Sequence, residues 1–125
     1  MFRLYAVRIF TYQWEEAVQF YRDTLGLEET FISEEFGWAQ YRVGGAQFGV
    51  ERCDPQDPET LTLVGRFVGA SLEVDDIQSV YEDLSSRGVV FTEPPTRQPW
   101  GGILAHFEDP DGNVLTLLDS NSDNA

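Results

Sequence analysis

The stretch HFEDPDGNVLTLLD, residues 106–119, carries two apolar runs on either side of a Pro-Asp-Gly-Asn corner. Pro110 fixes its own φ and Gly112 permits a positive φ, so the segment predicts a chain reversal between two strands. If the strands pair symmetrically about this corner, His106 lies opposite Thr116. Thr116 is the one hydroxyl among leucines. It is either an ordinary strand residue or the remnant of a ligand position.

Strand-like and helix-like segments precede this corner in a repeated order. In residues 14–27, WEEAVQFYRDTLGL, apolar residues recur at spacings of three and four, which predicts an amphipathic helix ended by Gly26. In DDIQSVYEDLSSRG, residues 75–88, Asp75 or Asp76 is the expected cap and Gly88 the stop. The expected strands are Phe2–Phe10, Glu29–Glu35, Trp38–Val43 and Ala46–Arg52, then Phe67–Val74, Val89–Glu93, Gly102–Glu108 and Asn113–Asp119.

The two halves align with an offset of about 62 residues, which is too long for a solenoid repeat. The acidic, proline-containing segment CDPQDPETL, residues 53–61, cannot be a central strand and is read as a connector. The sequence therefore predicts one α+β domain, residues 1–125, made of two βαβββ modules at about 1–58 and 65–119. The modules are expected to form a cupped mixed sheet with the helices on its outer face.

The charge balance is strongly acidic. The chain has 22 Asp and Glu against 8 basic residues, a formal net charge of −14, and all the basic residues are arginines. Such a surface repels nucleic acid and anionic membranes and attracts cations, although acidity also serves solubility or a salty habitat. No apolar run approaches the length of a membrane span. The single cysteine, Cys53, permits no internal disulfide and fits a cytoplasmic location.

Three segments, AVQFYRDTLGL, LEVDDIQSVYEDLSSRGV and FEDPDGNVLTLLD, resemble the vicinal oxygen chelate superfamily. This superfamily includes glyoxalase I, extradiol dioxygenases, and fosfomycin and bleomycin resistance proteins. The resemblance covers nearly the whole chain. It implies two βαβββ modules curled into a cupped sheet, in a homodimer. It leaves the activity open, because one fold hosts many functions.

The metal enzymes of this superfamily take His and Glu ligands from four strands. The resemblance aligns these positions with Ala6, Gly49, Gly69 (or its neighbours Ala70 and Ser71) and Thr116. None of these side chains is a useful ligand for a divalent cation, and the chain has one histidine. We therefore expect no metal and no cofactor.

The segment Gln98-Pro99-Trp100-Gly101 resembles bleomycin resistance proteins, which capture a cationic aromatic drug by stacking. The resemblance implies a metal-free small-molecule-binding protein of the antibiotic-resistance type, with a planar, cationic ligand. Stacking would come from Trp100 and Trp38. The expected ligand-binding residues are Trp100, Trp38, His106, Thr116, Glu51 and Arg8.

Alternatives remain for these residues. Trp100 either contacts a ligand or plugs the end of the sheet, and His106 is either a functional group or a hydrogen-bonded strand residue. Arg8 either pairs with Glu51 or Glu73 or binds an anion. No catalytic residue is assigned, because no nucleophilic triad is visible. The alternative function is a metal-independent enzyme of the same superfamily that uses His106 as acid and base.

Overall fold

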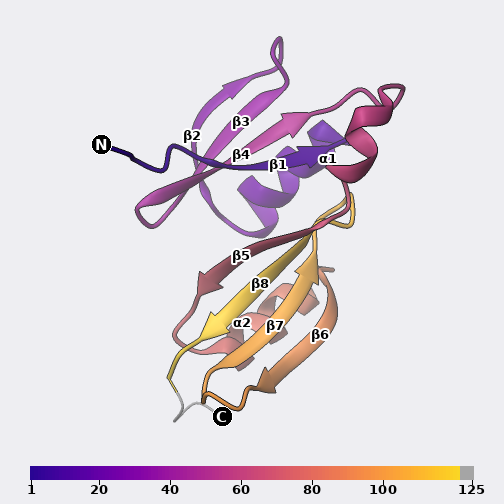
Figure 1. Ribbon diagram of the computed structural model, residues 1–125. Helices are drawn as coiled ribbons and strands as arrows, with labels where there is room; N and C mark the ends of the chain where they lie inside the picture. Colours follow the sequence, from indigo (N-terminus) through magenta and orange to yellow (C-terminus); the bar gives the residue numbers. More distant parts are fainter. Residues whose placement is uncertain (122–125) are drawn as a thin grey trace. The chain divides into compact units, whose positions relative to one another are not determined.

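The computed structural model describes residues 1–121, which form two successive modules with the same order of elements (Figure 1). The first module contains β1 (Val7–Thr11), α1 (Trp14–Gln19), the π-helical turn η1 (Phe20–Thr24), β2 (Glu28–Ser33), β3 (Trp38–Val43) and β4 (Ala46–Arg52). The 3-10 helix η2 (Pro58–Thr62) lies in the connector. The second module contains β5 (Phe67–Glu73), α2 (Ile77–Ser86), β6 (Val90–Arg97), β7 (Ile103–Glu108) and β8 (Val114–Asp119).

Each module forms a four-stranded mixed sheet, and the two sheets have the same topology. The strand orders are β1-β4-β3-β2 and β5-β8-β7-β6, with the first pair in each parallel and the other pairs antiparallel. The helices begin at Trp14 and Ile77, which preserves the offset of the sequence repeat. The predicted α+β fold of two βαβββ modules is therefore confirmed. Among the described residues no helix is long and apolar enough to span a membrane.

The chain divides into two compact units. Among the described residues, one comprises Met1–Arg66 with Pro110–Asn113, and the other comprises Phe67–Asp109 with residues 114–121. The corner between β7 and β8 therefore belongs to the first unit. There the backbone N–H of Tyr12 donates to Asp111 Oδ1 at 2.9 Å, and the Thr11 hydroxyl donates to the same carboxylate.

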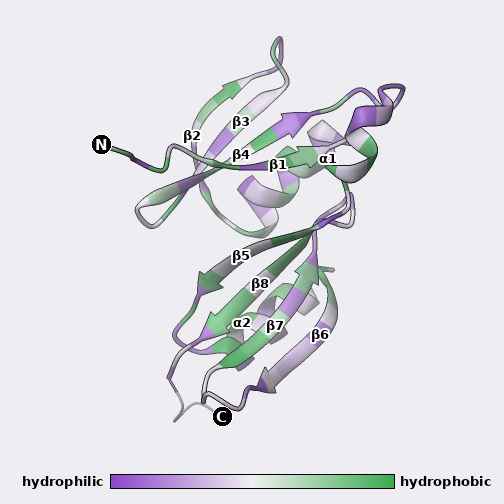
Figure 2. Ribbon diagram, viewed as in Figure 1, coloured by the Kyte–Doolittle hydropathy of each residue, from purple (hydrophilic) through white to green (hydrophobic). Residues whose placement is uncertain are grey.

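Each unit buries one face of its sheet beneath its own helix. In the first unit the buried side chains come from alternate strand positions, from α1 and from η1, and they include Ile9, Ala17, Tyr21, Ala39, Tyr41 and Val50. The Trp14 indole N–H donates to the Val50 carbonyl at 3.1 Å. In the second unit the buried residues include Ile77, Ala105, Phe107, Leu115 and Leu117. Figure 2 shows that β7 and β8, which supply most of these buried residues, are mainly hydrophobic, whereas β6 is largely hydrophilic.

The first strand was predicted to begin at Phe2, but it begins at Val7. Pairing starts at Val7↔Phe48, and β4 itself begins at Ala46 after a glycine turn. The register therefore offers no partner to the first residues of the chain. Phe2, for example, is 92% exposed.

Other boundaries also differ from the prediction, and β2, predicted as Glu29–Glu35, is Glu28–Ser33. The first helix is α-helical only to Gln19 and then widens into a π-helical turn. Strand β6 was predicted to end at Glu93 but continues to Arg97 through Pro94 and Pro95. Proline is tolerated there because β6 is the edge of its sheet, and the register shifts between Glu93 and Thr96.

The predicted reversal at the Pro-Asp-Gly-Asn corner is confirmed. His106 pairs with Thr116 and Glu108 with Val114, as symmetric pairing about the corner requires. Gly112 has φ +81°, a conformation that other residues rarely adopt. The corner therefore sets which face of β7 and β8 carries His106 and Thr116.

Candidate functional site

Three of the predicted ligand-binding residues lie on the face of the first sheet that α1 leaves uncovered. Trp38 pairs with Glu51, and Arg8 pairs with Gly49. Residues paired across neighbouring strands point to the same side of a sheet. The buried Tyr41 faces the helix, so Trp38, Glu51 and Arg8 share the opposite face. The structure thus brings these three side chains together.

Trp38 covers Gly49 on the neighbouring strand. A Cβ added at Gly49 would lie 2.6 Å from Cζ2 of Trp38, so no larger residue fits beneath this ring as it is placed. The indole N–H donates to Gln40 Oε1 at 2.8 Å. Gln40 also accepts from the Tyr5 hydroxyl at 2.9 Å and donates to Gln47 at 3.1 Å. The aromatic ring is therefore held in one orientation before any ligand arrives.

Arg8 and Glu51 form a two-point ion pair. Arg8 Nε and Nη2 donate to the two Glu51 carboxylate oxygens at 3.0 and 3.1 Å. The guanidinium carbon of Arg8 also lies 5.0 Å from the centre of the Phe10 ring, within the range of a cation–π contact. Of the two predicted acidic partners, Glu51 is the one used, since Glu73 accepts from Ser120 at 2.7 Å.

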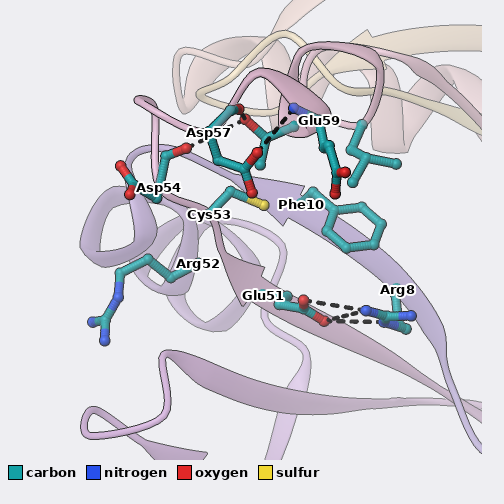
Figure 3. Close-up of a pocket in the computed structure, with 10 residues that line it drawn as sticks. Arg8, Phe10, Glu51, Arg52, Cys53, Asp54, Asp57 and Glu59 are labelled. Atoms are coloured by element: carbon teal, nitrogen blue, oxygen red, sulfur yellow. Dashed lines mark hydrogen bonds and ion pairs between the residues drawn. The ribbon is translucent and has the colours of Figure 1, made fainter.

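A hollow of about 400 Å³ opens beside this ion pair (Figure 3). Its wall combines the ends of β1 and β4 with the connector and consists of Arg8, Phe10, Glu51, Arg52, Cys53, Asp54, Asp57, Glu59, Thr60 and Leu63. Figure 3 shows Arg52 pointing away from the hollow, and its guanidinium donates to the Glu34 carbonyl at 3.1 Å. Four carboxylates and one nearby guanidinium, that of Arg8, therefore set its charge.

The connector was not predicted to form part of a site. The one feature of the sequence that could have indicated its role is the density of acidic residues and prolines in residues 53–61. The connector reaches β1 through long-range contacts. The Cys53 N–H donates to the Thr11 carbonyl at 2.8 Å, and Phe10 forms a parallel bridge with Val64. These contacts fold the acidic segment over the uncovered face of β1.

Cys53 lines the hollow as a protonated thiol. Burial raises its pKa above the ordinary value, and the neighbouring Glu51 carboxylate raises it further. Of the two causes, burial has the larger effect. At neutral pH the thiol is neutral and adds little nucleophilicity to the hollow.

Two further candidates, His106 and Thr116, lie in the second unit and touch each other. His106 Nδ1 is 2.9 Å from the Thr116 hydroxyl, and the Phe67 ring meets the imidazole edge-on with centroids 5.5 Å apart. Ala105 and Phe107 are buried on the α2 side, so His106 faces away from the helix. The histidine is thus a hydrogen-bonded strand residue on an uncovered face.

Trp100 stands on the turn between β6 and β7 and is 63% exposed. The turn is closed by a hydrogen bond from the Gln98 N–H to the Gly102 carbonyl at 2.7 Å. A Cβ at Gly102 would collide with the six-membered ring of Trp100, so this indole, like that of Trp38, rests on a glycine. Its exposure within this unit leaves aromatic surface available for contact.

The chain is an α+β protein of two like modules, each of which leaves one sheet face uncovered by its helix. It belongs to the Glyoxalase/Bleomycin resistance protein/Dioxygenase superfamily, whose sequence profile matches residues 3–117. The resemblance seen in the sequence is thereby confirmed.

Relatives of similar length support this assignment. The chain is 27% identical to the uncharacterized protein YraH of Bacillus subtilis (strain 168), covering 92% of this chain and 96% of YraH. A solved superfamily member from Sphaerobacter thermophilus DSM 20745 is 32% identical, covers 95% of this chain and 98% of its own, and has a TM-score of 0.78. TnmS3, an antibiotic binding protein from Streptomyces sp. CB03234, is 27% identical with a TM-score of 0.75, covering 95% and 96%.

The residues at the superfamily's metal-ligand positions do not fit a glyoxalase-type metal. The side-chain space over Gly49 is occupied by the Trp38 ring, and the Thr116 hydroxyl is engaged with His106. Ala6 supplies no donor atom. Across residues 1–121 no group of three or more His, Cys, Asp or Glu side chains is arranged to hold a metal ion.

Proposed function

We propose that the protein is a metal-free small-molecule-binding protein of the antibiotic-resistance type, which sequesters a planar, cationic ligand. The observation that carries this proposal is the Trp38 ring resting on Gly49 beside the Glu51 carboxylate. An aromatic platform thus takes the place where a glyoxalase-type enzyme would present a metal ligand. The similarity to TnmS3, described as an antibiotic binding protein, agrees with this reading.

The platform suits a flat ligand because it is fixed in advance. Hydrogen bonds from Trp38 to Gln40 and from Gln40 to Gln47 remove the rotational freedom that binding would otherwise have to freeze. Planar rings stack on an indole face with an energy beyond simple area burial. The carboxylates of the adjoining hollow and the net charge of −14 attract a cation over longer distances.

Trp100, His106 and Thr116 are the proposed ligand-binding residues of the second unit, considered by itself. The exposed indole offers a second stacking surface, and the imidazole offers a polar atom. The protein is further proposed to act as a homodimer in the cytoplasm. No contact with nucleic acid or membrane is expected from its charge.

Titration with a bleomycin-type drug tests this function, with calorimetry and tryptophan fluorescence as readouts. We expect saturable one-to-one capture without any product. Trp38→Leu should weaken capture about two- to tenfold, whereas Trp38→Phe, which keeps an aromatic ring, should weaken it less. Equal affinity in wild type and Trp38→Leu would show that this platform does not bind the ligand.

The alternative function, a metal-independent enzyme, is favoured by one specific observation. Thr116 fixes the Nδ1 side of the His106 imidazole, while Nε2 has no hydrogen-bond partner within residues 1–121. A histidine held in this way can accept or donate a proton at the remaining nitrogen. Product formation that disappears in His106→Ala would replace the sequestration proposal with this one.

A further inference from the structure

The Arg8 guanidinium makes the contacts that a binding site makes with a bound planar cation. It makes two hydrogen bonds to Glu51, at 3.0 and 3.1 Å, and its carbon lies 5.0 Å from the centre of the Phe10 ring. A carboxylate fork and an aromatic face are the two groups that best recognise a planar cation. Both groups also line the hollow beside the connector. Glu51 and Phe10 therefore form a cation-binding site, and Arg8 of the same chain occupies it.

The two partners of Arg8 differ from it in burial. The Phe10 ring is only 7% exposed, so its position is fixed by packing. The Arg8 side chain is 57% exposed and the Glu51 side chain 30% exposed. Exposed ion pairs contribute little to stability, because water and salt screen them and because a long side chain must be ordered. Arg8 can therefore leave without disturbing the receptor that Phe10 and Glu51 form.

We propose that Phe10 and Glu51 form a subsite for the cationic head group of the ligand. The Arg8 guanidinium occupies this subsite in the free protein, and a planar amidinium or guanidinium on the ligand displaces it. This inference rests on the proposed function and specifies the ligand's charged group. Glu51 would accept the two parallel N–H donors of the head group, and Phe10 would take its flat face. Arg8 and the head group of the ligand would then compete for Glu51 and Phe10.

The surroundings favour a cation over an anion in this subsite. Arg8 uses its Nε and Nη2 donors on Glu51, so an incoming anion would first have to break that pair. It would also meet Asp54, Asp57 and Glu59 of the connector. Arg66 lies 5.5 Å from the Phe10 ring, but its Nη2 donates to the Arg8 carbonyl and so does not compete for Glu51.

Three small probes of nearly the same planar shape test the inference, namely benzamidine as the cation, benzamide as the neutral compound and benzoate as the anion. Their affinities are measured by calorimetry or NMR titration on the full chain, for wild type, Arg8→Ala and Arg8→Gln. Removing the internal competitor should lower the dissociation constant of benzamidine about two- to fivefold. Benzamide should be unaffected, and Glu51→Gln should weaken benzamidine binding.

Arg42→Ala is the matched control. Arg42 lies on the same sheet, is similarly exposed and forms an ion pair with Glu28 at 2.7 Å, but it does not line the hollow. It changes the net charge by the same amount as Arg8→Ala. Tighter benzamidine binding in the Arg8 variants than in Arg42→Ala would therefore show displacement and not a general charge effect. Circular dichroism and thermal unfolding confirm that each variant is folded.

Two results would overturn the inference. One is benzamidine binding in Arg8→Ala that is no tighter than in Arg42→Ala. The other is benzoate binding to wild type that Arg8→Ala abolishes, because Arg8 would then be an anion-binding group. Neither result bears on drug capture through Trp38, which the Trp38 variants measure separately. The subsite and the proposed function can therefore fail independently.

Discussion

Tyr41 shows how a single polar atom is accommodated beneath α1. Its ring is fully buried, and its hydroxyl donates to Glu29 Oε1 at 2.9 Å. Burial raises the pKa of this phenol well above its ordinary value, and the hydrogen bond to the Glu29 carboxylate raises it further. The folded protein therefore keeps Tyr41 neutral at a pH at which the unfolded chain ionises it.

This shift predicts a loss of stability at alkaline pH. Below about pH 10 the phenol is neutral in both states, and its contribution to stability is fully present. Above that pH only the unfolded chain releases the proton, so the free energy of unfolding falls by up to about 1.4 kcal/mol per pH unit. Urea unfolding of wild type and Tyr41→Phe from about pH 8 to pH 11 measures this effect. Because Tyr41→Phe lacks this proton, wild type should lose stability relative to the variant, and parallel curves would contradict the assignment.

Among the elements, the Pro-Asp-Gly-Asn corner has a second role besides reversing the chain. Asn113 is fully buried, and its Nδ2 donates to the Phe10 carbonyl at 2.9 Å. Its Oδ1 accepts from the backbone N–H groups of Gly65 and Arg66 at 2.9 and 3.2 Å. The side chain therefore ties the end of β1 to the end of the connector, the two segments that meet at the hollow.

Asn113→Ala should destabilise the protein by about 2 kcal/mol, because three backbone groups lose the partner that this fully buried side chain supplies. Chemical denaturation measures the change. Gln56→Ala, an exposed position in the connector, is the control and should change stability by less than about 0.5 kcal/mol. If the two variants proved equally stable, Asn113 would not be the tie that its hydrogen bonds suggest.

The elements also show what the sequence could predict. The bounds of β3 and β4 agree with the prediction, because glycine turns frame both strands and apolar residues alternate within them. Short-range signals also sufficed for the helix starts and for the corner. The ends of the edge strands β1 and β6 were harder to predict. The first strand starts late, and β6 continues through two prolines, because pairing register and edge position decide these points.

The candidate site was predictable only in part, for the same reason. Residue type pointed to Trp38, Glu51 and Arg8, but their shared face follows from the strand register of the structure. The hollow was missed because its second wall depends on the connector folding back onto β1. The cover of Trp38 over Gly49 was also missed, since it joins two strands whose register a single sequence does not specify.

For the whole molecule, the net charge of −14 gives ligand binding a definite salt dependence. A cationic ligand is attracted by the summed field of the carboxylates, and salt screens that attraction over about 10 Å at 0.1 M. Stacking on Trp38 has little charge character and should persist in high salt. Capture of a cationic ligand is therefore expected to weaken, but not vanish, as salt is added.

The proposed homodimer should respond to salt in the opposite direction. Each chain carries the same charge of −14, so two copies repel each other, and salt reduces that repulsion. Large apolar side chains such as Phe2, Phe36 and Phe67 are more than 60% exposed, and burying them on association does not depend on charge. Sedimentation velocity at about 0.05 M and about 1 M NaCl should therefore show tighter dimerisation at the higher salt. A monomer under both conditions would remove the dimer from the proposal. Dissociation at high salt would instead indicate an interface held by Arg–carboxylate pairs, which the eight arginines of the chain would have to supply.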